Sequence, residues 1–395
     1  MLFYQENAYM PKLIRITTVP LSLKLLLTDQ MKFMKTAGWE VVMVSSDGKE
    51  VNEVVKREGC PHQVIPFTRK ITPFQDLYCI WLLIKLFKEE RPDIVHTHTP
   101  KAGLLGMIAA KLTRVPIRVH TLAGLPYILT ARRKKMLLVA MEKLTFRLST
   151  EIWPNAFSLK DFIVSEKLVE TDQIDKIKVI GAGSSNGVNL DKFDRKELKE
   201  NHLVAAMMRI SPGENDYIFL AVGRLVKDKG IEDLVEAFIK SKVVNKSKLV
   251  LLGSYEQDLN PLKDEIVRKI QDHPRIVQVD WTDHVAHYMA ISDVLIHASY
   301  REGFPNVLLE AGAIHCPVIC SDITGNKEVI THYKTGLIFP VRNVEALKEA
   351  MEFAYVKKET MHGFAEKLFL QIHEKYDRGQ MHDMLLQNYQ RLLGA

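Results

Sequence analysis

Short apolar runs rich in β-branched residues alternate with helical segments along this 395-residue chain, and the pattern occurs twice. In the first half, the expected strands and helices lie at residues 13–18, 21–36, 39–45, 74–90, 93–98, 103–112 and 117–121. In the second half, they lie at residues 217–222, 230–240, 248–253, 262–272, 276–279, 294–297 and 318–321. Strands that read as continuous apolar runs are buried on both faces, as in parallel sheets. The alternation therefore predicts an α/β protein with two Rossmann-like, doubly wound domains.

A Gly-, Ser- and Asn-rich turn, GAGSSNG at 181–187, separates the two halves. We expect an N-terminal domain at 1–190, a C-terminal domain at 191–375, and a helix at 376–395 that crosses back to the first domain. The turn contains G-x-G but not G-x-G-x-x-G, so it is not read as a dinucleotide site. Ligands of such sheets bind beyond the carboxyl ends of the strands, which predicts a site in an interdomain cleft.

The bulk composition is that of a soluble globular protein, with 47% apolar and 26% charged residues. The four cysteines are widely spaced and suggest reduced thiols in a cytoplasmic protein rather than a disulfide framework. The first ten residues lack the basic start and apolar core of a signal peptide. No stretch approaches the roughly 20 apolar residues of a membrane span.

Positive charge is concentrated in the first half of the chain. Residues 1–190 hold 27 Lys and Arg against 18 Asp and Glu, a net charge of +9, whereas the remainder holds 27 against 30. The asymmetry predicts an anionic partner, either nucleic acid or an acidic membrane surface. Arg132, Arg133, Lys134 and Lys135 interleave with large apolar residues in the segment 126–148. This interleaving favours an anionic membrane surface as the partner. The alternative is a core helix with a solvated basic edge.

No nucleic-acid motif is present, so no nucleic-acid partner is expected.

Two cations follow a strand of the second half in the segment GRLVKDKG. Arg224 and Lys229 stand near the start of the next expected helix, where a guanidinium, an ammonium and free backbone amides can bind an anion together. A solvated basic turn is the alternative interpretation.

Two glutamates frame the segment EGFPNVLLEAG. Pro305 suits the first turn of a helix, which places Glu302 in the preceding loop and Glu310 inside the helix. The two carboxylates could therefore contact different parts of one extended ligand. The alternatives are a surface charge for Glu310 and, for Glu302, an acid favoured by the helix dipole.

These motifs, together with SDITGNKEVI, resemble the family 4 retaining glycosyltransferases of the GT-B fold, including their E-x7-E motif. The N-terminal segments TTVPLSLKLLLTDQ, HTHTPKAGLLGMIAAKL and HTLAGLP are similar to a subgroup that extends undecaprenyl-diphosphate-linked glycans. That subgroup includes bacterial N-glycan, capsule and O-antigen enzymes. The resemblance implies an acceptor-binding, membrane-facing first domain and a donor-binding second domain.

The resemblance also implies roles for residues of the donor site. Arg224 and Lys229 would hold the donor diphosphate and stabilise the leaving group, Glu302 would hold hydroxyls of the transferred sugar, and Glu310 would accept from the ribose. The other implied donor-binding residues are Gly253, Trp281, Asp283, Gly303, Phe304, Pro305, Asn306, Val307 and Leu308, of which the amides of the last three would cap the phosphates. The chain has no D-x-D triplet, so we expect no metal and no other cofactor.

On the acceptor side, the candidate residues are Ser22, His98, Lys101 and His120. The loop after the first strand lacks the glycines that many relatives carry there, and Ser22 or nearby amides would substitute. Ala123 stands where many relatives have a histidine, and a buried structural role for His120 is an equal alternative. His96 and His98 would share one face of a strand, but no third ligand suggests a metal.

The sequence thus predicts a retaining glycosyltransferase that moves a hexose or N-acetylhexosamine to a polyprenyl-diphosphate-linked glycan in cell-surface polysaccharide biosynthesis. The nucleotide-sugar donor would be a UDP-sugar by family preference. The enzyme would be cytoplasmic and peripheral on the inner face of the cell membrane. Two alternatives remain: a UDP-N-acetylhexosamine 2-epimerase of the same fold and a non-catalytic sugar-nucleotide-binding subunit.

Overall fold

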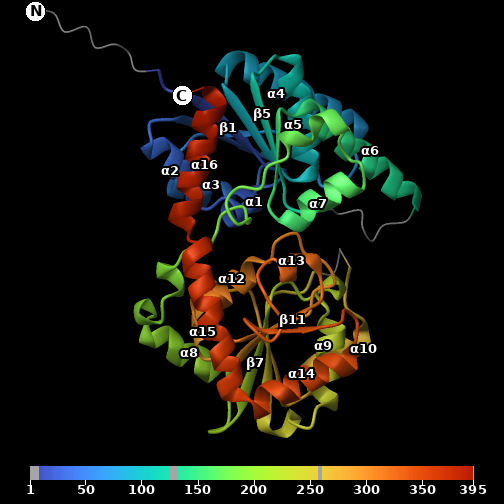
Figure 1. The fold of residues 1–395 in the computed structure, drawn as a ribbon, viewed down its shortest axis with the longest axis vertical. Coiled ribbons are helices and arrows are strands. Elements are labelled where there is room, and N and C mark those ends of the chain that lie inside the picture. The colour runs from blue at the N-terminus through green and yellow to red at the C-terminus, as the bar shows by residue number, and fades with distance from the viewer. Residues whose placement is uncertain (1–8, 125–131, 257–259, 395) are drawn as a thin grey trace, which may run out of the picture. The chain divides into compact units, whose positions relative to one another are not determined.

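The computed structural model describes residues 9–124, 132–256 and 260–394, except the side chains of 132–134. The chain forms two compact units (Figure 1). The first holds the chain up to Asn186 and the segment from Gly379 onward, and the second spans Gly187–Arg378. The units therefore divide at Asn186 and Arg378, a few residues from the expected boundaries.

The first unit is built on a six-stranded sheet in the order β3-β2-β1-β4-β5-β6. Every strand pairs with its neighbours in parallel. The strands are β1 (Lys12–Ile16), β2 (Glu40–Ser45), β3 (His62–Val64), β4 (Ile94–His98), β5 (Ile117–Leu122) and β6 (Glu151–Pro154). The strand order reverses between β1 and β4, which makes the carboxyl ends of these strands the expected ligand side.

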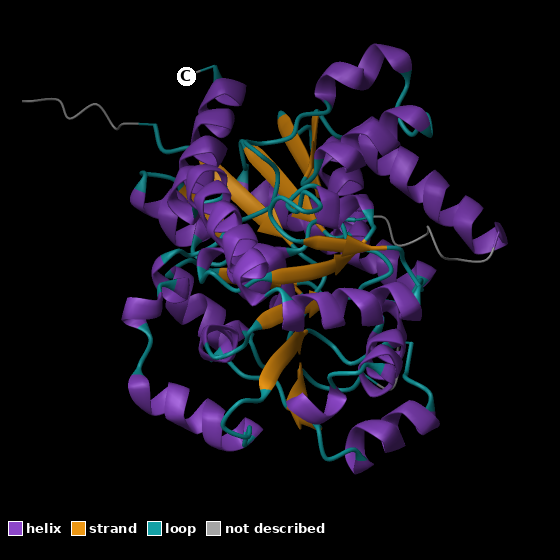
Figure 2. Ribbon diagram, turned by 60° about the horizontal axis from the view of Figure 1, so that its bottom comes forward, coloured by secondary structure: helices purple, strands orange, loops and turns teal. Residues whose placement is uncertain are grey.

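Helices cover both faces of this sheet (Figure 2). They are α1 (Pro20–Leu26), α2 (Gln30–Thr36), α3 (Val51–Glu58), α4 (Pro73–Glu90), α5 (Pro100–Leu112), α6 (Arg132–Leu148), α7 (Phe157–Ser165) and the C-terminal α16 (Arg378–Leu393). Neighbouring residues of β1 enter different cores, because successive side chains of a strand point to opposite faces. Leu13 packs in a cluster with Trp39 and Tyr389, whereas Ile14 packs in a cluster with Leu83 and Met107. The C-terminal helix thus belongs to the core of the first unit.

The second unit repeats the plan with the sheet order β12-β11-β10-β7-β8-β9. Its strands are β7 (Tyr217–Val222), β8 (Ser247–Leu252), β9 (Ile276–Val279), β10 (Val294–His297), β11 (Val318–Ser321) and β12 (Leu337–Phe339). Its helices are α8 (Glu200–Ile210), α9 (Ile231–Lys240), α10 (Asp264–Asp272), α11 (Val285–Ala290), α12 (Asn306–Ala313), α13 (Thr324–Lys327), α14 (Val344–Val356) and α15 (Lys358–Lys375). In the described part of the chain, no helix is long and apolar enough to cross a bilayer.

The expected helix at 21–36 is two helices, and this prediction was wrong. The chain turns at Asp29, whose backbone is left-handed with φ 66°. The buried carboxylate of Glu58 accepts hydrogen bonds from the amides of Asp29 (3.0 Å) and Lys32 (3.1 Å). Glu58 therefore caps the second helix from a distant part of the chain, which a periodicity argument cannot detect.

Candidate functional site

The carboxyl ends of β7 and β8 lie close together at two glycines. A Cβ atom added to Gly253, whose φ is +150°, would lie 1.9 Å from the carbonyl oxygen of Gly223. The amide of Leu225 donates to the carbonyl of Ser254 at 2.9 Å, just beyond this contact. Gly253 is therefore needed for backbone packing, and that packing holds Arg224 just beyond the carboxyl ends of the two strands.

Arg224 projects an exposed guanidinium from this point. Its Nη1 pairs with the carboxylate of Glu256, a residue that the sequence motifs did not single out. An exposed ion pair contributes little net stability. A ligand phosphate can therefore replace the carboxylate of Glu256 at low cost.

Three side chains from three elements meet at the end of β10. The Nζ atom of Lys229 bonds Oε1 of Glu302, and Nε2 of His297 lies 3.5 Å from the same oxygen. Lys229 closes a short 3-10 turn that leads into α9 through Gly230. A Cβ atom added to Gly230 would lie 2.1 Å from the carbonyl oxygen of Ala298, so glycine permits the close approach of this turn to β10.

The charges in this cluster are set by burial and by the neighbouring groups. Burial acts to raise the pKa of Glu302, but the nearby His297 ring and the charge of Lys229 hold that pKa well below its usual value. Burial lowers the pKa of His297 despite the nearby carboxylate. The site thus contains a neutral imidazole, an ammonium and an ionised carboxylate. Such a carboxylate accepts hydrogen bonds and never donates, which suits the hydroxyl groups of a ligand.

The loop after Glu302 leads directly into α12. Pro305 precedes the first helical residue, Asn306, and the amide of Leu308 donates to the Pro305 carbonyl at 3.0 Å. The amide of Leu308 is thus engaged in the helix start, and those of Asn306 and Val307 are the remaining candidates for contact with an anion. The order predicted for the two glutamates is confirmed, because Glu302 lies before the helix and Glu310 within it.

The loop is held in place by packing on both sides. A Cβ atom added to Gly325, in α13, would lie 2.9 Å from the carbonyl oxygen of Gly303. The buried ring of Phe304 packs on Tyr376 with 5.7 Å between ring centroids. Gly303 and Phe304 therefore shape the loop itself, whichever ligand it binds.

Glu310 faces a different electrostatic environment from Glu302. Burial raises its pKa to about 7, although Lys192 and Arg378 act in the opposite direction. This carboxyl group is therefore easier to protonate than that of an exposed glutamate. It can accept a hydrogen bond from a hydroxyl group in either its charged or its neutral form.

The loop after β9 lies next to the loop after β8, because the two strands are neighbours in the sheet. The amide of Gly253 donates to the carbonyl of Val279 at 2.8 Å. Trp281 and Asp283 follow β9 and are exposed. The structure therefore places Gly253 and this exposed loop at one edge of the same sheet, beside Arg224.

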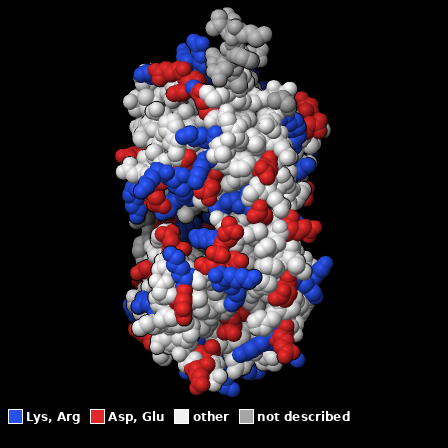
Figure 3. All heavy atoms as spheres, turned by 90° about the vertical axis from the view of Figure 1, so that its left-hand side faces the viewer, with Lys and Arg blue, Asp and Glu red and all other residues white. Residues whose placement is uncertain are grey.

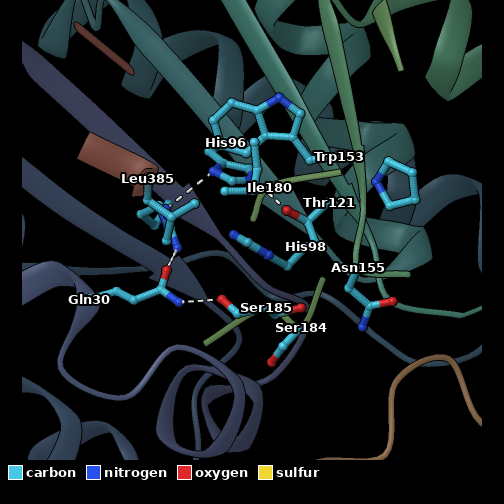
Figure 4. Close-up of a pocket in the computed structure, with 12 residues that line it drawn as sticks. Gln30, His96, His98, Thr121, Trp153, Asn155, Ile180, Ser184, Ser185 and Leu385 are labelled. Carbon is cyan, nitrogen blue, oxygen red and sulfur yellow. Dashed lines mark hydrogen bonds between the residues drawn. The ribbon is translucent and has the colours of Figure 1, made fainter. Parts of the chain in front are cut away.

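The first unit contains a small polar cavity at the carboxyl ends of its central strands (Figure 4). Its volume is about 20 Å³, room for one water molecule. His98, Thr121 and Asn155 from the ends of β4, β5 and β6 line it, together with Arg15 and Gln30. In the close-up, His98 lies between Thr121 and the pair Ser184 and Ser185.

A buried cation lies against this cavity. Arg15 is 1% exposed, and its guanidinium bonds the hydroxyl of Tyr389, Oε1 of Gln30 and, at 3.2 Å, Nδ1 of His96. The other ring nitrogen of His96 lies 2.7 Å from the hydroxyl of Thr121. No sequence motif pointed to Arg15, although an arginine inside an apolar strand run is an unusual enough residue to have done so.

Three buried polar atoms of the cavity lining have no hydrogen-bond partner among the described residues. They are Nε of Arg15, Nε2 of His98 and Oδ1 of Asn155. Burial, with Arg15 and His120 nearby, lowers the pKa of His98 well below its usual value, so its ring is neutral. Unpaired buried polar atoms are costly, which favours a polar occupant such as a hydroxyl group or a water molecule.

The other predicted acceptor residues lie outside this cavity lining. Lys101 donates to the hydroxyls of Thr68 (2.9 Å) and Thr72 (3.2 Å), to the carboxylate of Asp76 (2.6 Å) and to a backbone carbonyl. These contacts use its donors to fix the 68–72 loop. Ser22 sits in the first turn of α1 with its amide bonded to the Val19 carbonyl at 3.0 Å.

His120 is buried beneath α5 and α6. Its Nδ1 lies 2.8 Å from the hydroxyl of Thr97, and its Nε2 lies 3.8 Å from Oε1 of Glu142. A Cβ atom added to Gly103 would clash with the His120 ring at 2.4 Å. These contacts favour the structural alternative for His120.

The predicted membrane residues Arg132, Arg133, Lys134 and Lys135 form the start of α6. The side chains of the first three lie outside the described residues, as do Tyr127, Ile128 and Leu129. Lys135 is exposed, as are the apolar Met136 and Leu137 that follow it.

Charged groups elsewhere are mixed. On the face drawn in Figure 3, Lys and Arg are interspersed with Asp and Glu in both units. Within the described ranges, no group of three or more His, Cys, Asp or Glu side chains is arranged to hold a metal ion. All four cysteines are buried and unpaired.

Two protein-family models match the chain. The model described as glycosyl transferases group 1 matches residues 207–368, which include Arg224, Lys229, Glu302 and Glu310. The model described as glycosyl transferase 4-like matches residues 18–155. The second of these segments contains His98, Thr121 and Asn155 of the first-unit cavity, whereas Arg15 lies outside both segments.

Several named relatives align over most of the chain. The capsular polysaccharide biosynthesis glycosyltransferase CapM of Staphylococcus aureus is 34% identical, over 86% of this chain and 87% of its own. An Escherichia coli protein named UDP-Gal:alpha-D-GlcNAc-diphosphoundecaprenol alpha-1,3-galactosyltransferase is 29% identical, over 72% of this chain and 71% of its own. A Campylobacter jejuni N,N'-diacetylbacillosaminyl-diphospho-undecaprenol alpha-1,3-N-acetylgalactosaminyltransferase is 26% identical, over 78% and 79%.

Solved structures show the same fold. A glycosyltransferase from Rickettsia africae superposes with a TM-score of 0.80 at 22% identity, over 97% of this chain and 99% of its own. Anabaena Alr3699/HepE in complex with UDP superposes with a TM-score of 0.80 at 16% identity, over 97% and 100%. With the two six-stranded parallel sheets, these likenesses confirm the predicted GT-B fold class.

Proposed function

This chain belongs to the group 1 glycosyltransferases, and we propose that it transfers a sugar from a UDP-sugar to an undecaprenyl-diphosphate-linked glycan in cell-surface polysaccharide biosynthesis. The observation that carries the proposal is the cluster of Lys229, His297 and Glu302 beside Arg224, which offers two cations and one ionised acceptor to a single ligand. The relatives named for diphosphoundecaprenol acceptors support the acceptor class, and the UDP complex of a structural neighbour supports the donor class.

In this proposal the donor replaces protein carboxylates at the two cations. The diphosphate takes the place of Glu256 at Arg224 and draws Lys229 partly away from Glu302. Glu302 then accepts hydrogen bonds from the hydroxyls of the transferred sugar, which is a hexose or an N-acetylhexosamine. Glu310 accepts from the ribose, and the exposed loop at Trp281 and Asp283 borders the base.

The proposed reaction retains the configuration at the anomeric carbon and needs no metal. The bond between that carbon and the diphosphate oxygen breaks as the acceptor oxygen bonds the same face. The proton of the acceptor hydroxyl passes to the departing diphosphate. Arg224 and Lys229 stabilise the charge that develops on the leaving group, which is the kind of contribution that usually dominates catalysis in such sites.

For the acceptor, we propose His98 as the contact residue of the first unit. Its Nε2 is neutral, buried and unpartnered among the described residues. Asn155 adds an acceptor and Arg15 a donor to the same small cavity. The cavity volume limits the group that enters to a single hydroxyl or a water molecule that bridges to the glycan. We further propose that the enzyme is peripheral on the inner face of the membrane that carries its acceptor.

The test is transfer by the full chain from a panel of labelled nucleotide sugars to short-chain polyprenyl-diphosphate glycans in detergent. We expect label in the lipid-linked product with one UDP-sugar and without added metal. Conversion of a UDP-sugar into its epimer with no labelled lipid would contradict the proposal and indicate an epimerase. Binding of a UDP-sugar with neither product would indicate a non-catalytic binding subunit.

A further inference from the structure

Helix α4 carries an exposed row of large apolar side chains on the first unit. Phe74, Leu77, Tyr78 and Trp81 are 91%, 64%, 51% and 57% exposed. Their spacing of three and four residues places them along one face of the helix. The rings of Tyr78 and Trp81 stack with centroids 5.9 Å apart. Contiguous exposed apolar surface of this kind marks an interaction site.

The opposite face of α4 is already used by the fold. Cys79, Leu83, Leu86 and Phe87 are buried in a core cluster that includes residues of α5. The two helices lie side by side over the sheet (Figure 1). The exposed row is therefore not needed to hold the helix in place, and its apolar character calls for a separate explanation.

Cations stand at both ends of this row. Arg69 and Lys70 are exposed just before the helix, next to the exposed Ile71. Lys85 and Lys88 are exposed seven residues after Tyr78 and Trp81, hence on the same face two turns later. Glu89, directly after the last of these lysines, is exposed, and its Oε1 lies 3.8 Å from Nζ of Lys85. Asp76 is the one acid in the sequence 69–88. It points away from the row and bonds Lys101 at 2.6 Å.

Lys101 gives this surface a fixed shape. Its ammonium joins Thr68, Thr72 and Asp76, so the loop that carries Arg69 and Lys70 is tied to the first turn of α4. The loop and helix thus present cations and aromatic rings together on a prebuilt platform. This assigns a structural task to a residue that the sequence had suggested for acceptor binding.

We propose that the α4 outer face, meaning Ile71, Phe74, Leu77, Tyr78 and Trp81 with their flanking cations, docks on the surface of an anionic lipid bilayer. Tryptophan and tyrosine favour the headgroup level of a membrane, where one end of the ring is apolar and the other is wet. Lysine and arginine beside an inserted apolar face are attracted to anionic lipid. The inference rests on the proposed function in one respect: a lipid-linked acceptor requires the enzyme to work at a bilayer.

A second copy of the chain fits this face less well. In a two-fold symmetric contact, the same patch lies on both partners. A parallel pairing of the helices would bring Arg69 and Lys70 of the two copies together. An antiparallel pairing would bring them next to Lys85 and Lys88, where Glu89 is already paired with Lys85. Like charges brought together across an interface oppose association. An anionic bilayer complements the same arrangement.

The test is sedimentation of the full chain with phosphatidylcholine vesicles that contain or lack phosphatidylglycerol. Phe74→Ser combined with Trp81→Ser should lower the bound fraction on anionic vesicles about tenfold or more, since two large apolar groups no longer insert. Lys85→Gln combined with Lys88→Gln should lower binding about tenfold on anionic vesicles and leave binding to neutral vesicles unchanged. The matched control is Met208→Ser combined with Leu370→Ser, which removes two exposed apolar side chains of the second unit.

Equal vesicle binding by the Phe74 and Trp81 double variant and by the control would overturn the proposal. So would a dimer in light scattering that this variant dissociates while vesicle binding is unchanged. Transfer to a short-chain acceptor in detergent is the separate readout of the proposed function. Retained transfer with lost vesicle binding supports membrane docking. Absence of transfer by every form, with the expected pattern of vesicle binding, would count against the proposed function alone.

Discussion

At the scale of single residues, the charge state of Glu302 depends on two neighbours from different elements. Lys229 supplies a countercharge, and the neutral ring of His297, at the end of β10, lies 3.5 Å from the same carboxylate oxygen. The sequence motifs predicted Lys229 and Glu302 separately, and the structure brings them into contact. His297 was not predicted, because it ends an apolar strand run and its proximity to Glu302 follows from the fold of the 298–302 loop.

Replacement of Lys229 by alanine should abolish most of the transfer activity. The variant loses a cation from the leaving group, and Glu302 loses its countercharge. We expect kcat/KM to fall by a factor of about 10²–10³. Removal of one hydrogen-bond donor that stabilises the developing charge of a transition state has an effect of this size. Steady-state transfer assays with the full chain check this value. The control is Lys227→Ala, which removes an exposed lysine from the same turn. Full activity in the Lys229 variant would refute the proposed mechanism.

Glu142 offers a second test at this scale. Burial raises the pKa of its carboxyl group to about 7, and its Oε1 has no hydrogen-bond partner among the described residues. The folded state therefore holds a proton that the unfolded chain releases near its ordinary pKa of 4.5. The protonated carboxyl group therefore contributes its full stabilisation of the folded state below that pKa. This stabilisation is lost as the pH rises toward 7.

Substitution of Glu142 by glutamine should remove this pH dependence. Between pH 4.5 and 7, the free energy of unfolding of the natural protein should fall relative to that of the variant by about 3 kcal/mol. Urea denaturation at several pH values measures the difference. If the two proteins differ in the free energy of unfolding by the same amount at every pH in this range, the pKa of Glu142 is not raised in the folded state. Glu166→Gln, at an exposed position of the same unit, serves as the control.

At the scale of elements, the break between α1 and α2 shows what local pattern cannot provide. The apolar spacing over 21–36 suits one long helix, and the second helix begins where it does because Glu58, from the end of α3, accepts the amides of Asp29 and Lys32. The three-residue strands β3 and β12 were missed for a related reason. Their partners in the sheet, rather than their own sequences, define them.

Replacement of Glu58 by alanine should destabilise the first unit by about 2–3 kcal/mol, since two amides at the start of α2 lose a buried charged acceptor. Loss of the ion pair with Arg57, at 2.8 Å, adds to the effect. Glu53→Ala is the matched control from the same helix, because its exposed pair with Lys24 should contribute less than about 1 kcal/mol. Chemical denaturation followed by circular dichroism measures both. Equal stability of the two variants would show that Glu58 does not cap α2.

At the scale of the whole molecule, the alternation of strands and helices was enough to predict two parallel sheets, because buried parallel strands carry their signal in their own composition. The polar cavity of the first unit was harder to foresee. Arg15 from β1 and Leu385 from α16 both line it. The guanidinium of Arg15 also bonds the hydroxyl of Tyr389, 374 residues away in the chain. Contacts at such separation leave no periodic trace, so the sequence does not reveal which residues join Arg15 and Asn155 at the cavity.

Removal of the segment 379–395 tests how far the first unit depends on this distant partner. Met381, Leu385 and Tyr389 are buried against Leu13 and Trp39, and the Tyr389 hydroxyl bonds the buried Arg15. A chain that ends at Arg378 would expose this core face and leave Arg15 short of a partner, so we expect the first unit to lose cooperative unfolding. The second unit retains its sheet, and UDP should still raise its unfolding temperature, because Arg224, Lys229, Glu302 and Glu310 all lie within it. Calorimetry with and without UDP checks both outcomes, with a chain that ends at Leu393 as the control. An intact transition of the first unit in the shortened chain would show that α16 is dispensable for its fold.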